Sequence, residues 1–318
     1  MFKLPNFPSP RASDDELADF AEIVAWQVGF ASTTDISKYL GINDDNIDDN
    51  GEEFRGCEDQ EDEHNERLEA VFELLGERQR ICGDAYPFSL DASGSVLRAV
   101  EIEGHASREL YLYFLGATRI NMRTNKMLEG VDGALLMEEV CCEAIKHYLG
   151  PDRAESIILG TASSGGFKER VDQLVKSIQE PCSFQNINGE EAPVRAQDDG
   201  VDVIGWLPFA DGAPGKLAIF AQVKTGTSWR ENVLECQPEN FQKKWLNGAL
   251  TVSPVRAFCV AEAVGRTGHW NSTCCDAGVL LDRCRLVSCC VIDGFSRLND
   301  LRNWVSGAKG LISERFPA

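Results

Sequence analysis

The chain has 318 residues, a length that suits one large domain or two ordinary ones. It is 43% hydrophobic and 26% charged, which is typical of a globular protein and excludes a disordered one. The formal net charge of −20 argues against indiscriminate nucleic-acid binding, which depends on lysine and arginine, although it leaves room for a local basic groove.

Neither a membrane span nor a signal peptide is predicted from the sequence. No apolar run reaches the length of a membrane span, and residues 1–20 lack the basic and apolar segments of a signal peptide. The twelve cysteines contain no CxxC pair and no zinc spacing, so we interpret them as small buried residues in a reducing compartment. We therefore expect a cytoplasmic protein with no membrane partner.

The N-terminal part, residues 1–129, reads as a mostly helical accessory region. Ser13 and Glu16 form a capping box that begins the first helix. Residues 33–42 predict a short helix with a faint helix-turn-helix character, and residues 68–75 predict an amphipathic helix. Residues 95–103 suit a strand, whereas residues 109–120 suit either a strand or a buried helix.

An acidic segment interrupts this region. Residues 44–69 hold thirteen Asp and Glu against only Arg55 and Arg67. One interpretation is an exposed loop that runs into a solvated helix face, and the other is a segment that docks a partner or masks the protein's own surface. Because so many like charges repel and few apolar groups accompany them, we expect residues 44–65 to be poorly ordered or held by a partner.

Residues 130–318 predict an α/β domain with a mixed sheet flanked by helices. Two apolar runs separated by the turn-rich residues 210–215 suit an antiparallel hairpin. The predicted helices cover residues 134–150, 167–179, 277–286 and 298–312, and the predicted strands cover residues 201–209, 216–224 and 255–264.

Polar residues gather at one end of the predicted hairpin. Gln222 and Lys224 are two residues apart on a strand, so their side chains point to the same face. Asp202 begins the neighbouring strand and falls opposite Gln222 if the strands pair antiparallel. Glu138 lies on the apolar face of the helix 134–150, where an unpaired carboxylate is costly, whereas Glu139 is expected to point outward.

This set resembles the PD-(D/E)XK nuclease superfamily, and GVDVI (200–204) with QVK (222–224) is most similar to its Mrr-like restriction-endonuclease branch. The resemblance implies a core of a helix, an antiparallel hairpin, a helix and a further strand, here over roughly residues 130–265. Asp202 matches the family's Asp, and Lys224 matches its Lys. Gln222 stands where most members carry an acid, and the predicted helix 167–179 is an insertion.

The resemblance also implies the chemistry of the site. Phosphodiester hydrolysis uses a hard cation, here Mg²⁺ or Mn²⁺, which prefers oxygen ligands. Glu138, Asp202, the amide oxygen of Gln222 and the main-chain carbonyl of Val223 would supply these oxygens. Lys224 would orient or deprotonate the attacking water, or offset charge that develops on the phosphate.

Basic and aromatic residues follow the hairpin, and they suggest where a nucleic acid binds. Trp229, Arg230, Lys243 and Lys244 are candidates for a cationic and stacking surface, to which Trp245 could add. The alternative is a solvated helix face with two core tryptophans.

We therefore expect a metal-dependent DNA endonuclease, in a setting that the resemblance places in bacterial defence against foreign DNA. The acidic segment suggests control by a partner protein, such as an ATPase, a helicase or a sensor of a defence system, and a homo-oligomer is also compatible. The main alternative is a catalytically inert nuclease fold that acts through its acidic N-terminal half. A third is a transcription regulator that uses residues 33–42. The sequence does not choose between DNA and RNA, or between duplex and single strand.

Overall fold

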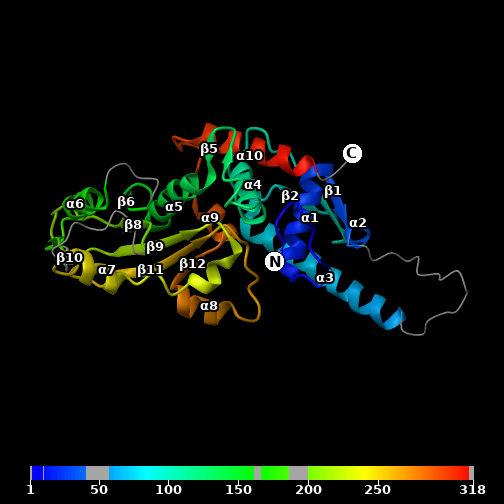
Figure 1. Ribbon diagram of the computed structural model, residues 1–318, viewed down its shortest axis with the longest axis horizontal. Coiled ribbons are helices and arrows are strands. Elements are labelled where there is room, and N and C mark those ends of the chain that lie inside the picture. The colour runs from blue at the N-terminus through cyan, green and yellow to red at the C-terminus, as the bar shows by residue number, and fades with distance from the viewer. Residues whose placement is uncertain (1, 10, 41–56, 161–165, 186–199, 315–318) are drawn as a thin grey trace, which may run out of the picture.

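The structure is a computed structural model that describes residues 2–9, 11–40, 57–160, 166–185 and 200–314, with only the backbone for residues 57–64. Figure 1 shows an elongated molecule. A five-stranded sheet occupies one end, and the N-terminal helices occupy the other. Residues 44–56 of the acidic segment, half of it, lie outside the described residues; from Cys57 onward its backbone is helical.

The large sheet is mixed, as the sequence predicts. Its strand order is β12-β11-β9-β8-β6, in which β6, β8 and β9 pair antiparallel while β9, β11 and β12 pair parallel. The predicted antiparallel hairpin is confirmed, with Val203 opposite Ala221. The strands are β6 (Glu155–Ile158), β8 (Val203–Trp206), β9 (Ala218–Lys224), β11 (Val255–Val260) and β12 (Val279–Leu281).

Helices cover both faces of this sheet. Asp132 caps helix α5 (Gly133–Leu149) by accepting hydrogen bonds from the N–H groups of Ala134 and Leu135. Helix α5 packs on the face formed by the odd-numbered residues of β9. Helices α6 (Phe167–Ile178) and α7 (Pro238–Trp245) pack on the face formed by the even-numbered ones.

Two segments differ from the sequence prediction. Residues 277–286 are not one helix: Gly278, at φ 74°, ends α8 (Trp270–Ala277), β12 follows, and buried Asp282 caps α9 (Arg283–Cys289). The short run Val279–Leu281 gains more from pairing with β11 than from a helix of its own. The other difference is β6, an edge strand absent from the prediction, because four residues of which none is buried give a weak pattern.

The N-terminal region is helix-rich, as predicted. The capping box of Ser13 and Glu16 begins α1, and the run 109–120, which suited either structure, is helical as far as Arg119. A small antiparallel sheet of order β1-β3-β2 packs beside these helices. The elements are α1 (Asp14–Val28), β1 (Phe30–Ser32), α2 (Thr33–Tyr39), α3 (Cys57–Cys82), η1 (Gly83–Ala85), β2 (Phe88–Leu90), β3 (Val96–Ala99) and α4 (Ala106–Arg119).

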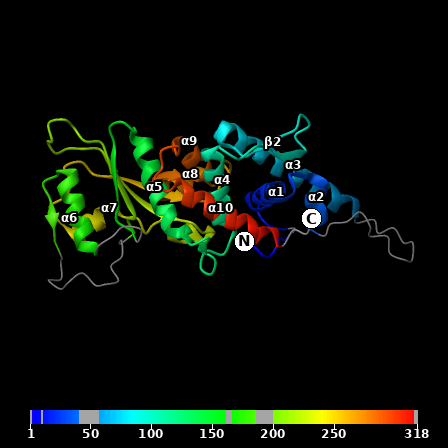
Figure 2. The same ribbon diagram turned by 90° about the horizontal axis from the view of Figure 1, so that it is seen from above.

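The C-terminal helix α10 (Leu298–Ser313) returns to pack along α4, which Figure 2 shows between the sheet and α1. One apolar cluster extends from Phe2 to Ile312 and crosses residue 130. The domain boundary expected there stays a prediction. The remaining short elements are β4 (Met127–Leu128), β5 (Val131–Asp132), β7 (Ser183–Phe184), η2 (Thr227–Asn232) and β10 (Leu246–Asn247).

A buried ionic network joins the N-terminal helices to α9. Both oxygens of Asp19 on α1 are paired: Oδ1 lies 2.7 Å from Arg78 and 2.9 Å from Arg283, and Oδ2 lies 2.7 Å from Arg119. Glu22, one turn further along, accepts hydrogen bonds from the hydroxyls of two buried tyrosines. These charges are fully buried, so each depends on the others for compensation.

Most of the described cysteines are buried, which agrees with their interpretation as small core residues. Burial raises the pKa of the Cys142 thiol to about 11 and that of Cys236 to about 12. Such thiols are neutral at pH 7 and poor nucleophiles.

Candidate active site

Asp202 is held in the plane of the sheet, at the point where β8 begins. Its N–H donates to the carbonyl of Ala221 at 2.9 Å, and its Oδ2 accepts from the N–H of Val223 at 2.7 Å. The side chain therefore takes over the role of a backbone acceptor beyond the end of the ladder. Asp202 is buried, so the hydrogen bond from Val223 contributes to holding a carboxylate there.

Gln222 and Lys224 share the face of β9 that α6 and α7 cover, as the spacing predicts. Gln222 is 2% exposed, and its Nε2 donates to Glu235 Oε2 at 3.0 Å. The Nζ of Lys224 lies 3.5 Å from the same oxygen. The other end of the amide, Gln222 Oε1, is buried and has no hydrogen-bond partner among the described residues.

Glu138 reaches this end of the sheet from α5, on the opposite face from Gln222. It is half-buried at the margin of the apolar face of α5, and its carboxylate lies so close to Gly160 that a side chain there would collide with it. The N–H of Gly160 donates to the main-chain carbonyl of Asp202 at 3.0 Å. One residue thus connects Glu138 to the segment that carries Asp202.

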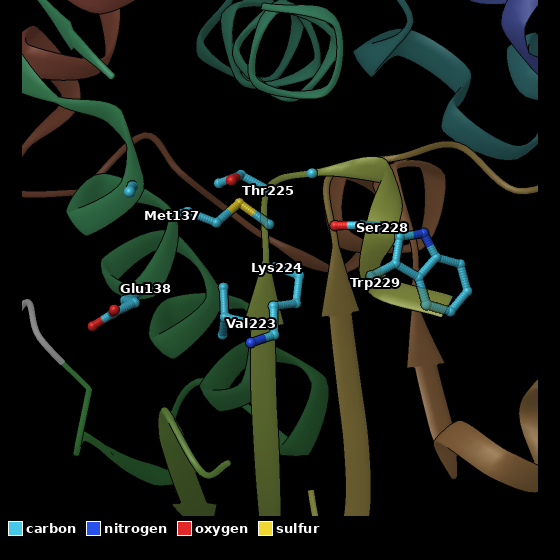
Figure 3. A pocket seen from close by; sticks show the side chains of 9 residues that line it. Met137, Glu138, Val223, Lys224, Thr225, Ser228 and Trp229 are labelled. Atoms are coloured by element: carbon cyan, nitrogen blue, oxygen red, sulfur yellow. The ribbon is translucent and has the colours of Figure 1, made fainter. Parts of the chain in front are cut away.

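Glu138 and Lys224 line a common pocket of about 160 Å³. Figure 3 shows Glu138 on the helix to one side and Lys224 on the strand, with Met137 and Val223 between them. In that view the carboxylate of Glu138 points away from the amino group of Lys224. Glu139, which the sequence places outward, is instead half-buried and pairs with Arg297 at 2.6 Å, while burial raises its pKa.

The carbonyl of Val223 is directed toward Asp202. In a strand the N–H and C=O of one residue point to the same side, and the N–H of Val223 donates to Asp202. The carbonyl of Lys224 points the other way, because it accepts from Ala261 beside β11. Val223 can therefore contribute a main-chain oxygen on the side where Asp202 lies.

Glu235 was not predicted as a site residue. It lies eleven positions after Lys224, beyond η2, and no spacing in the sequence marks it. Only the path of the chain returns its carboxylate to Gln222 and Lys224.

The expected nucleic-acid contacts divide into two groups, and Trp229 requires correction. Its ring is 1% exposed, its indole N–H donates to Glu262, and it packs near Phe258, so it is a core residue with no free face for a base. Arg230 is partly exposed, but its guanidinium pairs with Glu262 at 2.7 Å. Trp245 is likewise buried.

Lys243 and Lys244 are exposed in the last turn of α7. Helix α7 begins at Pro238, shortly after Glu235, and leads away from the candidate site to β10, at the end of the sheet remote from α1 (Figure 1). These lysines therefore do not border the pocket that Glu138 and Lys224 line.

Within the described ranges, no three His, Cys, Asp or Glu side chains lie close enough together to hold a metal ion. A cation at the hairpin end would therefore also need neutral oxygens. The orphaned oxygen of Gln222 and the carbonyl of Val223 are of that kind, and hard cations accept amide and carbonyl ligands. The residues present fit a magnesium or manganese ion on this basis.

Comparisons with protein-family models, with curated proteins and with solved structures found no match to this chain. No helix in the described part of the chain is both long and apolar enough to cross a membrane.

Proposed function

We propose that the protein is a metal-dependent endonuclease that hydrolyses phosphodiester bonds of DNA. The observation that carries this proposal is the hairpin end. There the Asp202 carboxylate accepts from the N–H of Val223, Gln222 and Lys224 both contact Glu235, and the buried oxygen of Gln222 lacks a partner in the described residues. A buried acceptor left unpaired costs about 1–3 kcal/mol, and a bound ion is one of the partners that would remove this cost.

The order of elements supports a restriction-endonuclease-like fold. Helix α5, the β8–β9 hairpin, α7 and β11 follow one another as the resemblance to the PD-(D/E)XK superfamily implies, with α6 as the inserted helix. Strand β11 lies parallel to β9 and completes the part of the sheet beside the site.

Each residue at the hairpin end has a part in the proposed reaction. Asp202, Gln222 and the Val223 carbonyl would hold Mg²⁺ or Mn²⁺, which would supply charge against the phosphate and a more acidic water. Glu138, which the sequence predicts as a ligand, lies on the opposite face from Gln222 and is not assigned to the ion. Lys224 projects from the end of β9 and is one-third exposed, so it can reach a phosphate or the attacking water. Asp202 keeps its carboxylate toward the site because Val223 fixes one of its oxygens.

A cleavage assay tests the proposal directly. Purified protein with Mg²⁺ or Mn²⁺ should cut plasmid or single-stranded DNA, excess EDTA should stop it, and Lys224→Ala should be inactive. Cleavage that persists undiminished in EDTA would contradict the metal mechanism. No divalent-dependent cleavage of either substrate would favour the alternative, an inert nuclease fold that acts through its acidic N-terminal half. Bacterial defence and a controlling partner protein remain part of the proposal.

Gln222→Glu should tighten divalent binding and keep cleavage within about tenfold of the wild type, a barrier change of about 1.4 kcal/mol. Without metal, the new carboxylate would face Glu235 in a buried position and repel it. We therefore expect a lower Tm than wild type in EDTA and a larger rise in Tm when Mn²⁺ is added. Differential scanning calorimetry with and without Mn²⁺ measures both effects. Equal Tm values with and without Mn²⁺ in both proteins would contradict metal binding at Gln222.

A further inference from the structure

We propose that Glu235 is a positioning residue that orients the amide of Gln222 so that its oxygen is available to a divalent cation. The inference rests on the proposed nuclease function and deepens it, because it explains how a neutral side chain can serve where an acid is usual.

The amide of Gln222 has two different ends, and Glu235 distinguishes them. An NH₂ group donates, whereas the amide oxygen and a carboxylate both accept. With Nε2 at 3.0 Å from Glu235 Oε2, the hydrogen bond is charge-assisted. In the reversed orientation the amide oxygen would face a carboxylate oxygen and the hydrogen bond would be lost. Glu235 therefore selects the orientation that leaves Oε1 buried and unpaired in the described structure.

Lys224 completes this arrangement. Its Nζ lies 3.5 Å from the same oxygen of Glu235, so the carboxylate sits between a donor amide and a cation. Half of the Glu235 side chain is exposed, and the neighbouring positive charge offsets the cost of placing it beside a buried amide. Asp202 hydrogen-bonds to Ala221 and Val223, the two residues that flank Gln222, so the oriented oxygen belongs to the same strand end as the Asp202 carboxylate.

The loop that carries Glu235 contacts β9 and packs closely against the segment that precedes β8. The N–H of Glu235 donates to Asn232, and the next residue, Cys236, contacts the carbonyl of Phe220 on β9 through its thiol. Gly200, two residues before Asp202, has φ 80°, and a Cβ there would lie 2.6 Å from the carbonyl oxygen of Glu235. These contacts hold Glu235 by the backbone, so its position does not depend on its side-chain contacts alone.

Calorimetric titration with Mn²⁺ alone, without substrate, tests the inference. Residues that orient a metal ligand are worth about 10–100-fold in affinity, so Glu235→Ala should weaken Mn²⁺ binding by that factor. Glu235→Gln keeps an acceptor for Gln222 Nε2 at the same length, and Lys224 Nζ beside that atom favours the new amide's oxygen there over its NH₂ group, so affinity should return to within about threefold, roughly 0.6 kcal/mol. Glu239→Ala, which removes an exposed acid from the first turn of α7, is the matched control and should bind as the wild type does.

A double mutant identifies the route of the effect. If Glu235 acts through Gln222, the variant Gln222→Met with Glu235→Ala should bind Mn²⁺ no more weakly than Gln222→Met alone. If the losses of Mn²⁺ affinity in the two single variants instead add in the double variant, and Glu235→Gln binds as weakly as Glu235→Ala, then Glu235 is a direct ligand and the inference is overturned. Wild-type affinity in Glu235→Ala would overturn it as well.

The same titration separates this inference from the proposed function. Mn²⁺ affinity that depends on Glu235 in a protein that cleaves no DNA would support the inference while contradicting the nuclease proposal. A wild-type protein with neither Mn²⁺ affinity nor cleavage would overturn both.

Discussion

Asp202→Asn should abolish divalent-dependent cleavage while leaving the fold intact. The asparagine oxygen can still accept from the N–H of Val223, so the hydrogen bond that ends the β8–β9 ladder is kept. The change removes a negative charge from the proposed metal ligands, among which Gln222 is already neutral. Since outer residues of metal sites are worth about 10–100-fold, loss of a direct carboxylate ligand should lower the rate by more than about 100-fold.

The measurement pairs a plasmid-cleavage rate with a thermal unfolding curve. Asp152→Asn makes the same charge change in the exposed turn after α5, and it should cleave as the wild type does. Asp202→Ala is a poorer choice, because it leaves the buried N–H of Val223 unpaired at a cost of about 1–3 kcal/mol. An Asp202→Asn variant as active as the wild type would show that the chemistry is absent or lies elsewhere.

Asp19→Ala should be the most destabilising of the substitutions considered. It leaves three buried guanidinium groups, those of Arg78, Arg119 and Arg283, without their shared carboxylate. Removing one partner of a buried pair typically costs about 3–5 kcal/mol, a large part of the 5–15 kcal/mol that stabilises an ordinary domain. Urea unfolding at pH 7 measures the loss, and Asp19→Asn, which keeps the shape, is the alternative if the alanine variant does not fold.

The control for this substitution is Asp14, which lies on the same helix α1 but forms an exposed ion pair with Arg67 of α3. Asp14 pairs with Arg67 at 3.2 Å but is half exposed, so Asp14→Ala should cost less than about 1 kcal/mol. If Asp19→Ala lost no more stability than Asp14→Ala, the buried network would not hold the N-terminal helices to α9.

The same network should make stability depend on pH in the acid range. Burial by itself would raise the pKa of Asp19, but Arg283, Arg119 and Arg78 outweigh burial and hold that pKa well below its ordinary value. The folded state therefore favours the ionised carboxylate. Its contribution is complete above the unfolded pKa of about 3.9 and is lost as the pH falls below it. Urea unfolding at several values between about pH 5 and about pH 2 measures this dependence. The free energy of unfolding should fall less steeply with decreasing pH in Asp19→Ala than in the wild type.

Local patterns in the sequence determined much of the architecture. The capping box at Ser13 and Glu16 marks the start of α1, and the turn-rich segment between two apolar runs predicts the hairpin. The two-residue spacing of Gln222 and Lys224 correctly predicts a shared face, because side chains on any strand alternate. These features depend on residues that are near one another in the chain.

Tertiary structure alone decided the surroundings of the site. Glu235 reaches Gln222 through the path of a loop, and Trp229 is buried because η2 folds onto Phe258. Glu138 meets the sheet end from the face opposite Gln222, which no helical periodicity specifies. Arg283 and Asp19 are 264 residues apart in the chain, yet they share two hydrogen bonds. Such contacts depend on how elements pack across the whole chain, whereas periodicity and caps record only the preferences of neighbouring residues.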